Sequence, residues 1–338
     1  LGISFLEDSG YMARMAYMLD RVFRYFGLHG ASIMPFIVSG GIPGGCAVPG
    51  VMAARTLRSP KEKLATMLTA PFLSCGAKVP VFLLIAAAFF PHNAAELLFI
   101  ITLLGWGAAL LTARILRSSL IRGEATPFVM ELPPYRMPTL KGVCIHAWER
   151  AWQYIKKAGT IILGISILIW AAMTFPGLPE QEAAEYAARQ SALESQLAEA
   201  KSADAKSRVE QQLKALQDKQ AQSALQNSVA GRLGTFLEPV SSLAGFDWRT
   251  NIALTGGFAA KEVIVSSLGT AYSLGEVSPD EARPLAQRLR QDSNFSLLAG
   301  ISLMVFVLLY TPCFVTVVTM ARESSWKWAG FSMAFNTA

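Results

Sequence analysis

Three cysteines and one glutamate lie inside apolar stretches of the sequence, each beside residues that break helices. They are Cys46 in SGGIPGGCAVPG, Cys75 in APFLSCGAKVPVF, Cys313 in LLYTPCFVT and Glu262 in TGGFAAKEVIVSS. Sulfur, a carboxylate and the backbone carbonyls of a broken helix suit a borderline first-row ion such as Fe(II) better than an alkali ion. We therefore predict that these four residues bind a transition-metal cation.

Each of these residues also has a simpler interpretation. A buried cysteine often serves only as a small apolar side chain. Glu262 is costly at membrane depth, which favours a function in an ion pathway, but an ion pair with Lys261 or Lys78 would make it structural. Lys78 would repel a cation, so we expect it to be a counter-ion or a snorkelling anchor.

The composition indicates a membrane protein. Of the 338 residues, 52% are hydrophobic and only 16% are charged, whereas soluble domains carry roughly 25% charged residues. A transmembrane helix needs about 20 mostly apolar residues. The stretches that are long enough, or nearly so, are Leu97 to Ala113, Ala158 to Phe175 and Leu297 to Met320. The net charge of +6 needs no nucleic-acid partner, since basic residues collect in cytoplasmic loops, here between Thr112 and Lys157.

The four interrupted stretches predict an interior site. A helix broken inside the bilayer exposes backbone groups that lipid cannot satisfy, so the break must face protein or a wet cavity. A Gly-Gly break followed by a Cys-containing break occurs twice, which is typical of a duplicated transporter fold with the substrate site at the paired breaks. We expect the carbonyl ends of the broken helices to face the cation.

The composition of one segment is not typical of a transmembrane region. Residues 179 to 230 are rich in Ala, Gln, Glu, Lys and Ser. Apolar residues recur there at helical spacing: Leu193, Leu197 and Ala200, then Val209, Leu213 and Leu216. This pattern predicts a polar helical hairpin or a short coiled coil outside the membrane.

Several ordered motifs carry a family resemblance. They are FLEDSGYMARMAYMLDR, CAVPGVMAARTL, LTAPFLSCGAKVPVF, GFDWRTNIALTGGFAAKEVIVSSLGT and LLYTPCFVTVV. Together they resemble the membrane part of the ferrous iron transport protein B (FeoB) family. Members commonly read GCNVPA where this chain has GCAVPG at 45 to 50, so a role for that Asn amide does not carry over. Cys46, Cys75, Glu262 and Cys313 match the family motifs.

The resemblance implies a system for Fe(II) uptake across the bacterial inner (cytoplasmic) membrane. It also implies two gate-type repeats and a GTP-binding domain. No GxxxxGK[ST] phosphate loop occurs in these 338 residues, so the GTPase, with its GTP and Mg, is expected upstream. Further expected partners are the lipid bilayer, small accessory Feo proteins and a second copy of the chain.

The predicted fold class is an all-α polytopic membrane protein, with two gate-type repeats, interrupted transmembrane helices and an extramembrane helical insert. The predicted parts are the end of a preceding span with an amphipathic helix (1–26), the first repeat and following span (27–178), the insert (179–230) and the second repeat, cut in its last span (231–338). We expect a transporter rather than an enzyme, because no His or Asp pairs with the thiols as a hydrolase would require. The alternative is a nucleoside or other small-solute transporter of the same architecture.

Overall fold

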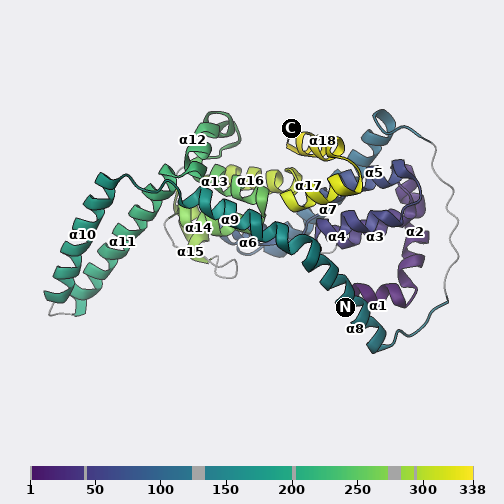
Figure 1. The fold of residues 1–338 in the computed structure, drawn as a ribbon, viewed down its shortest axis with the longest axis horizontal. Helices are drawn as coiled ribbons and strands as arrows, with labels where there is room; N and C mark the ends of the chain where they lie inside the picture. The colour runs from purple at the N-terminus through teal and green to yellow at the C-terminus, as the bar shows by residue number, and fades with distance from the viewer. Residues whose placement is uncertain are drawn as a thin grey trace. The chain divides into compact units, whose positions relative to one another are not determined.

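The computed structural model describes residues 2–41, 44–123, 134–199, 203–272, 283–292 and 295–337. Within these ranges every regular element is a helix (Figure 1), which confirms the all-α prediction. Two helical segments in the described ranges are long and apolar enough to cross a membrane, Ala94–Ser119 and Leu297–Glu323. Gly30–Gly41 and Val79–Phe89 are apolar but shorter. The number of crossings beyond these two stays a prediction.

The chain divides into two compact units. Unit 1 consists of Leu1–Ala86, His92–Gly164 and Leu303–Ala338, and unit 2 consists of Ala87–Pro91 and Ile165–Ser302. Unit 1 therefore contains all three cysteines predicted as ligands, and unit 2 contains Glu262. Unit 1 combines segments from both halves of the sequence. The boundaries of the two repeats stay predictions.

Unit 1 is built mainly from short helices around one long one. Its helices are α1 (Gly2–Asp8), α2 (Tyr11–Tyr25), α3 (Ile33–Phe36), α4 (Ala47–Ala53), α5 (Pro60–Thr69), α7 (Ala94–Ser119), α8 (Leu140–Tyr154), α17 (Phe314–Glu323) and α18 (Trp326–Thr337). Three more helices have residues in both units: α6 (Val79–Phe89), α9 (Thr160–Thr174) and α16 (Leu297–Leu309).

The core of unit 1 joins α2, α3 and α7 through aromatic side chains. Phe36 is fully buried, and its ring centroid lies 5.5 Å from that of Phe23 and 5.8 Å from that of Trp106. Ala109 and Ala113 on α7 are also fully buried. Such small side chains let neighbouring helices approach closely, which is how helices pack in a membrane where lipid supplies no hydrophobic drive.

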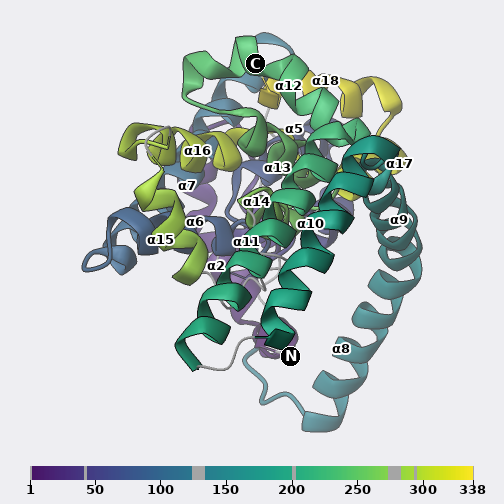
Figure 2. The ribbon, with the colours of Figure 1, turned by 90° about the vertical axis from the view of Figure 1, so that its left-hand side faces the viewer.

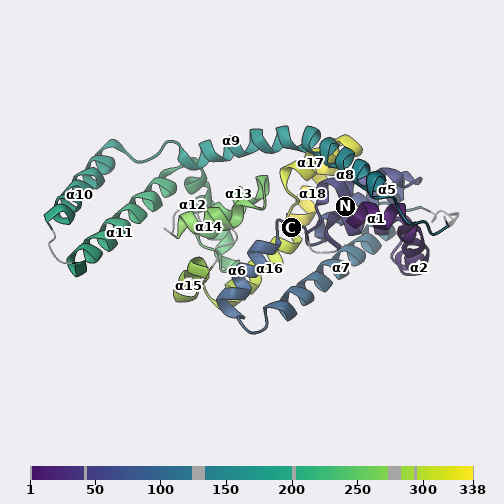
Figure 3. The ribbon, with the colours of Figure 1, turned by 90° about the horizontal axis from the view of Figure 1, so that it is seen from below.

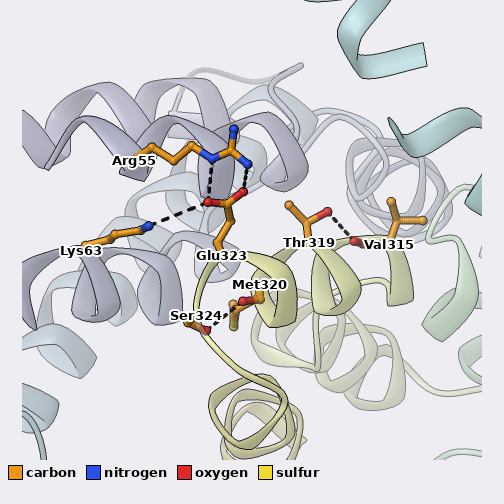
Figure 4. Close-up of polar contacts among 7 residues, drawn as sticks. All are labelled: Arg55, Lys63, Val315, Thr319, Met320, Glu323 and Ser324. Atoms are coloured by element: carbon orange, nitrogen blue, oxygen red, sulfur yellow. Dashed lines mark hydrogen bonds and ion pairs between the residues drawn. The ribbon is translucent and has the colours of Figure 1, made fainter. Parts of the chain in front are cut away.

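A charged cluster joins the C-terminal ends of α4 and α17 (Figure 4). Arg55, just beyond α4, donates from Nε to the Glu323 carboxylate at 2.6 Å and from Nη2 to its other oxygen. Lys63 Nζ of α5 lies 3.8 Å from the same carboxylate, whose side chain is only 7% exposed. The hydrogen bond to Glu323 is the main cause that raises the pKa of Arg55 above its ordinary value.

Replacing Glu323 with alanine is expected to lower the free energy of unfolding by about 1 to 2 kcal/mol, because two cations lose a nearly buried acceptor while remaining partly solvated. Thermal or denaturant unfolding of the purified protein in detergent measures this change. The matched control is Glu210→Ala, an exposed position on α11 (Ala203–Asn227). Equal stability of the two variants would contradict the importance of the cluster.

Unit 2 contains the polar hairpin and a bundle of shorter helices. Its helices are α10 (Glu180–Glu199), α11 (Ala203–Asn227), α12 (Val229–Ser241), α13 (Trp248–Ala259), α14 (Val263–Ala271) and α15 (Arg283–Gln291). Asp247 caps α13 by accepting from Thr250 N at 2.9 Å. Buried Asn251 ties α13 to α12, since its Nδ2 donates to Gly234 O at 3.0 Å and to Ser241 Oγ at 2.7 Å.

The predicted helical hairpin is confirmed in α10 and α11, which lie side by side (Figure 2, Figure 3). Tyr186 and Ser223 share a hydrogen bond of 3.1 Å between their hydroxyls, and Leu193 lies opposite Leu216 at the same hollow. Residues early in α10 thus meet residues late in α11, so the two helices are antiparallel. Ala200 lies outside the described residues. The position of the hairpin outside the membrane stays a prediction.

Candidate functional site

The predicted breaks at the cysteines are interruptions of helices in unit 1. The first follows the π-helical segment Ile37–Gly41 and ends at Cys46, which is extended and occupies the N-cap position of α4. Ile42 and Pro43 within it lie outside the described residues. The second separates α5 from α6, and the other Cys-containing break separates α16 from α17. Glycine and proline end each helix because they do not continue the backbone hydrogen-bond ladder favourably.

The first and second breaks pack backbone against backbone. Gly76 N donates to Gly45 O at 2.8 Å, and Gly45 and Gly76 are the immediate neighbours of Cys46 and Cys75. Gly40 has a φ of 130° and lies so close to the second break that a Cβ built on it would stand 2.4 Å from Ser74 O. The glycines therefore allow the two breaks to pack closely, and the backbone hydrogen bond joins the chain neighbours of Cys46 and Cys75.

Cys313 joins the same region through the pairing of α17 with α4. The two helices pack together (Figure 1), and Arg55 and Glu323 connect their C-terminal ends. The helices are therefore parallel, and their N-caps, Cys46 and Cys313, lie at the same end of the pair. All three thiols are half-buried, and the four cysteines, all within the described ranges, form no disulfide.

Two of the thiols stand at the beginning of a helix. Cys46 and Cys313 occupy the N-cap positions of α4 and α17, and the orientation of the carbonyl ends toward a cation stays a prediction. A helix N-terminus carries partial positive charge. Any cation at these two thiols is therefore held by sulfur against a repulsive helix dipole.

Lys78 does not snorkel, which corrects the expectation of an anchor at the membrane surface. Its side chain is 1% exposed. Its Nζ donates to the carbonyls of Pro71, Leu73 and Leu308 at 2.9, 3.1 and 2.8 Å. The backbone groups freed at the second break and at the end of α16 thus bond an ammonium group. Trp106 similarly donates from Nε1 to Gly41 O at 3.2 Å.

Among the described residues of unit 1, three buried hydroxyls make no hydrogen bond to the protein, and each belongs to a different break. They are Ser39, Ser74 and Thr311, whose side chains are 0%, 4% and 4% exposed. A buried polar atom without a partner is costly, and its persistence points to a water or ligand. Sequence reasoning missed these residues, although each stands just before the Gly-Gly, Cys or Pro-Cys of its break.

Glu262 lies in unit 2, in the turn between α13 and α14. Its side chain is exposed, whereas the neighbouring Lys261 is only 4% exposed. The break itself is confirmed, because Ala260 is extended and ends α13. Glu262 and the three thiols belong to different units of the chain, and within the described ranges no three His, Cys, Asp or Glu side chains form a preformed metal site.

Comparison with known proteins identifies the fold family. The Gate model, described as nucleoside recognition, matches residues 1–89 and 155–327, which is most of the chain. The chain belongs to the Gate family. A second family model, described as the C terminus of ferrous iron transport protein B, matches residues 98–150, between the two Gate segments. The resemblance to the FeoB family is thus confirmed.

Relatives of this Gate chain carry iron-transport names. A fusion of Fe(2+) transport protein A with the Fe(2+) transporter FeoB from Porphyromonas gingivalis is 42% identical over 99% of the chain and 39% of its own length. The Fe(2+) transporter FeoB of Helicobacter pylori is 39% identical over 99% of the chain and 51% of its length. That of Escherichia coli is 33% identical over 98% and 44%. The chain thus spans about half, or less, of these relatives, and no solved structure matches it.

Proposed function

We propose that this chain is the membrane portion of a system that carries Fe(II) across the bacterial inner membrane. Its spans are interrupted at four breaks, arranged as two gate-type repeats, and the hairpin of α10 and α11 lies outside the bilayer. The names of the relatives support Fe(II) as the substrate. Those relatives are about twice as long or longer, and we infer that a GTPase domain in the rest of such a protein couples GTP hydrolysis to transport.

The observation that carries this proposal is the convergence of three breaks in unit 1. They bring half-buried sulfur from Cys46, Cys75 and Cys313 to the same part of the structure as three buried hydroxyls that lack a protein partner. Thiol sulfur suits a first-row transition metal, and hydroxyl oxygens replace the water that such an ion sheds. Glu262 would act as a further oxygen ligand along the path.

The arrangement favours passage over storage. The three thiols form no preformed metal cage among the described residues, neither together nor with other ionisable side chains, and two of them stand at helix N-termini, whose partial positive charge repels a cation. Conduction requires binding that is strong enough for entry and weak enough for exit. We infer that Fe(II) enters partly hydrated, exchanges water for sulfur and hydroxyl ligands, and leaves as the repeats move.

Uptake by the full-length protein reconstituted in liposomes tests the substrate. Radiolabelled Fe(II) and a labelled nucleoside such as uridine are offered separately and then in competition. We expect Fe(II) influx that depends on the protein and is unaffected by excess uridine. Uridine influx, or inhibition of Fe(II) influx by uridine, would overturn the proposal in favour of a nucleoside carrier.

Replacing Ser74 with alanine is expected to separate stability from transport. Because the Ser74 hydroxyl has no protein partner, its removal breaks no hydrogen bond, so the melting temperature should stay the same or rise. Fe(II) uptake at matched membrane abundance should fall roughly threefold to tenfold, which corresponds to the loss of one hydrogen bond of about 1 kcal/mol. Ser191→Ala, on exposed α10, is the control, and unchanged uptake in Ser74→Ala would exclude the hydroxyl from the path.

A further inference from the structure

The ammonium of Lys78 occupies a cage of backbone carbonyls. Pro71 O, Leu73 O and Leu308 O lie 2.9, 3.1 and 2.8 Å from Nζ. A lysine ammonium has three N–H donors, so each carbonyl takes one of them. The side chain is 1% exposed, and the cage is therefore closed to bulk water.

The three carbonyls come from two breaks that are distant in sequence. Pro71 and Leu73 precede Ser74 and Cys75, whereas Leu308 is 230 residues from Lys78 and precedes Thr311 and Cys313. All of these residues belong to unit 1. The ammonium thus bridges the backbone of two thiol-bearing breaks. At Gly105, α7 approaches the residues beside these carbonyls closely, since a Cβ there would stand 3.0 Å from Phe72 O and 3.3 Å from Leu308 Cδ1.

We propose that these carbonyls form a monovalent-cation site that Lys78 permanently fills with its own tethered ammonium. Converging carbonyl oxygens are the ligands by which proteins replace the hydration shell of a monovalent cation such as K⁺. Lys78 has two effects in this cage. It holds the second break against the end of α16, and it keeps free cations out of a carbonyl site close to the thiols.

The consequence for transport rests on the proposed function. A site already filled by a fixed positive charge leaves the sulfur and hydroxyl groups as the places for a metal ion, so Lys78 is a positioning residue. Without its ammonium, the cage would accept a small free cation. The alkylammonium ions that bear N–H groups are the closest substitutes, because they reproduce both the charge and the donors.

The test uses the full-length protein purified in detergent and compares Lys78→Ala with the wild type and with Lys141→Ala, an exposed lysine on α8. Melting temperatures are measured in methylammonium, ethylammonium, tetramethylammonium and sodium chloride at equal ionic strength. This measurement does not depend on Fe(II) transport, so it stands even if the proposed substrate is wrong.

We expect Lys78→Ala to melt about 4 °C or more below the wild type in sodium chloride, as loss of a buried network predicts. Methylammonium or ethylammonium should recover at least half of that loss, whereas tetramethylammonium, which has no N–H group, should recover none. The wild type and Lys141→Ala should respond equally to all four salts. Equal melting of Lys78→Ala and wild type, or recovery without selectivity among the salts, would overturn the proposal.

A second variant tests the cation-site proposal if Lys78→Ala does not reach the membrane. Lys78→Gln keeps a neutral N–H donor on a side chain one bond shorter, and removes the charge. The cation-site proposal expects this variant to melt below the wild type and Fe(II) uptake to fall with it. Wild-type melting and uptake in Lys78→Gln would show that a neutral hydrogen bond suffices, and would reject the site.

Discussion

Replacing Cys46 and Cys75 together with serine is expected to reduce Fe(II) uptake by more than roughly tenfold, a loss of at least about 1.4 kcal/mol in stabilisation of the ion on its path. The two breaks that bear these cysteines are joined by a backbone hydrogen bond of 2.8 Å between Gly76 and Gly45, so both sulfurs are lost from one place. Serine keeps the size and supplies a hard oxygen, which suits Fe(II) less well than thiol sulfur does. Initial uptake rates in whole cells or liposomes, at matched membrane abundance, measure the effect.

The fourth cysteine provides the control for this experiment. Cys144 is exposed on α8, away from the breaks, so Cys144→Ser should transport as the wild type does. The Cys313→Ser variant should show an intermediate loss, because Cys313 lies at the same end of the α4 and α17 pair but on a separate break. Wild-type uptake by the Cys46 and Cys75 double variant would remove sulfur from the transport mechanism.

Gly40→Ala is expected to have the largest effect on stability, a loss of about 3 kcal/mol or more in the free energy of unfolding. Two causes add. The φ of 130° is strained for any residue with a side chain, and the new Cβ would stand 2.4 Å from Ser74 O and 2.8 Å from Cys75 N, both backbone atoms. The second break would have to move away from the first. Thermal unfolding in detergent measures the loss, and Fe(II) uptake should disappear with it.

Gly44 offers a matched control in the same break. Its φ is 103°, but a Cβ built there meets no atom within 4 Å. Gly44→Ala should therefore cost only the backbone strain, about 1 to 2 kcal/mol. If both alanine variants lose the same stability, the close approach of the two breaks contributes nothing, and the geometry proposed for the thiols is contradicted.

The location of the breaks was predictable from the sequence because Gly and Pro interrupt a helix by local chemistry alone. The pairing of α10 with α11 was also predictable, since Leu193 and Leu216 belong to regular apolar patterns. The contact between Lys78 and Leu308 was not predictable. Leu308 is 230 residues away, and no local pattern shows that its carbonyl would be free.

The helix ends at which the cysteines stand were not predictable from the sequence either. Whether a cysteine beside a break caps the helix that follows or ends the helix that precedes it depends on the backbone of a few residues, and Cys46 and Cys313 both cap the helix that follows. At the turn after α13, the sequence places Lys261 and Glu262 on different faces. Only tertiary packing decides that the lysine is the buried one.

The ion cluster of Arg55 and Glu323 joins α4 and α17 at one end only. Arg55 and Glu323 hold the C-terminal ends of the two helices together. A tilt of α17 about this point would displace each of its residues in proportion to the distance from the ion pair. With ten residues, α17 is a lever of about 15 Å. A tilt of about 10° would therefore shift its Cys313 tip by roughly 2 to 3 Å, comparable with a metal–sulfur bond of about 2.3 Å. A modest tilt about the Arg55 and Glu323 cluster would therefore be sufficient to make or break the metal–sulfur bond that we propose at Cys313.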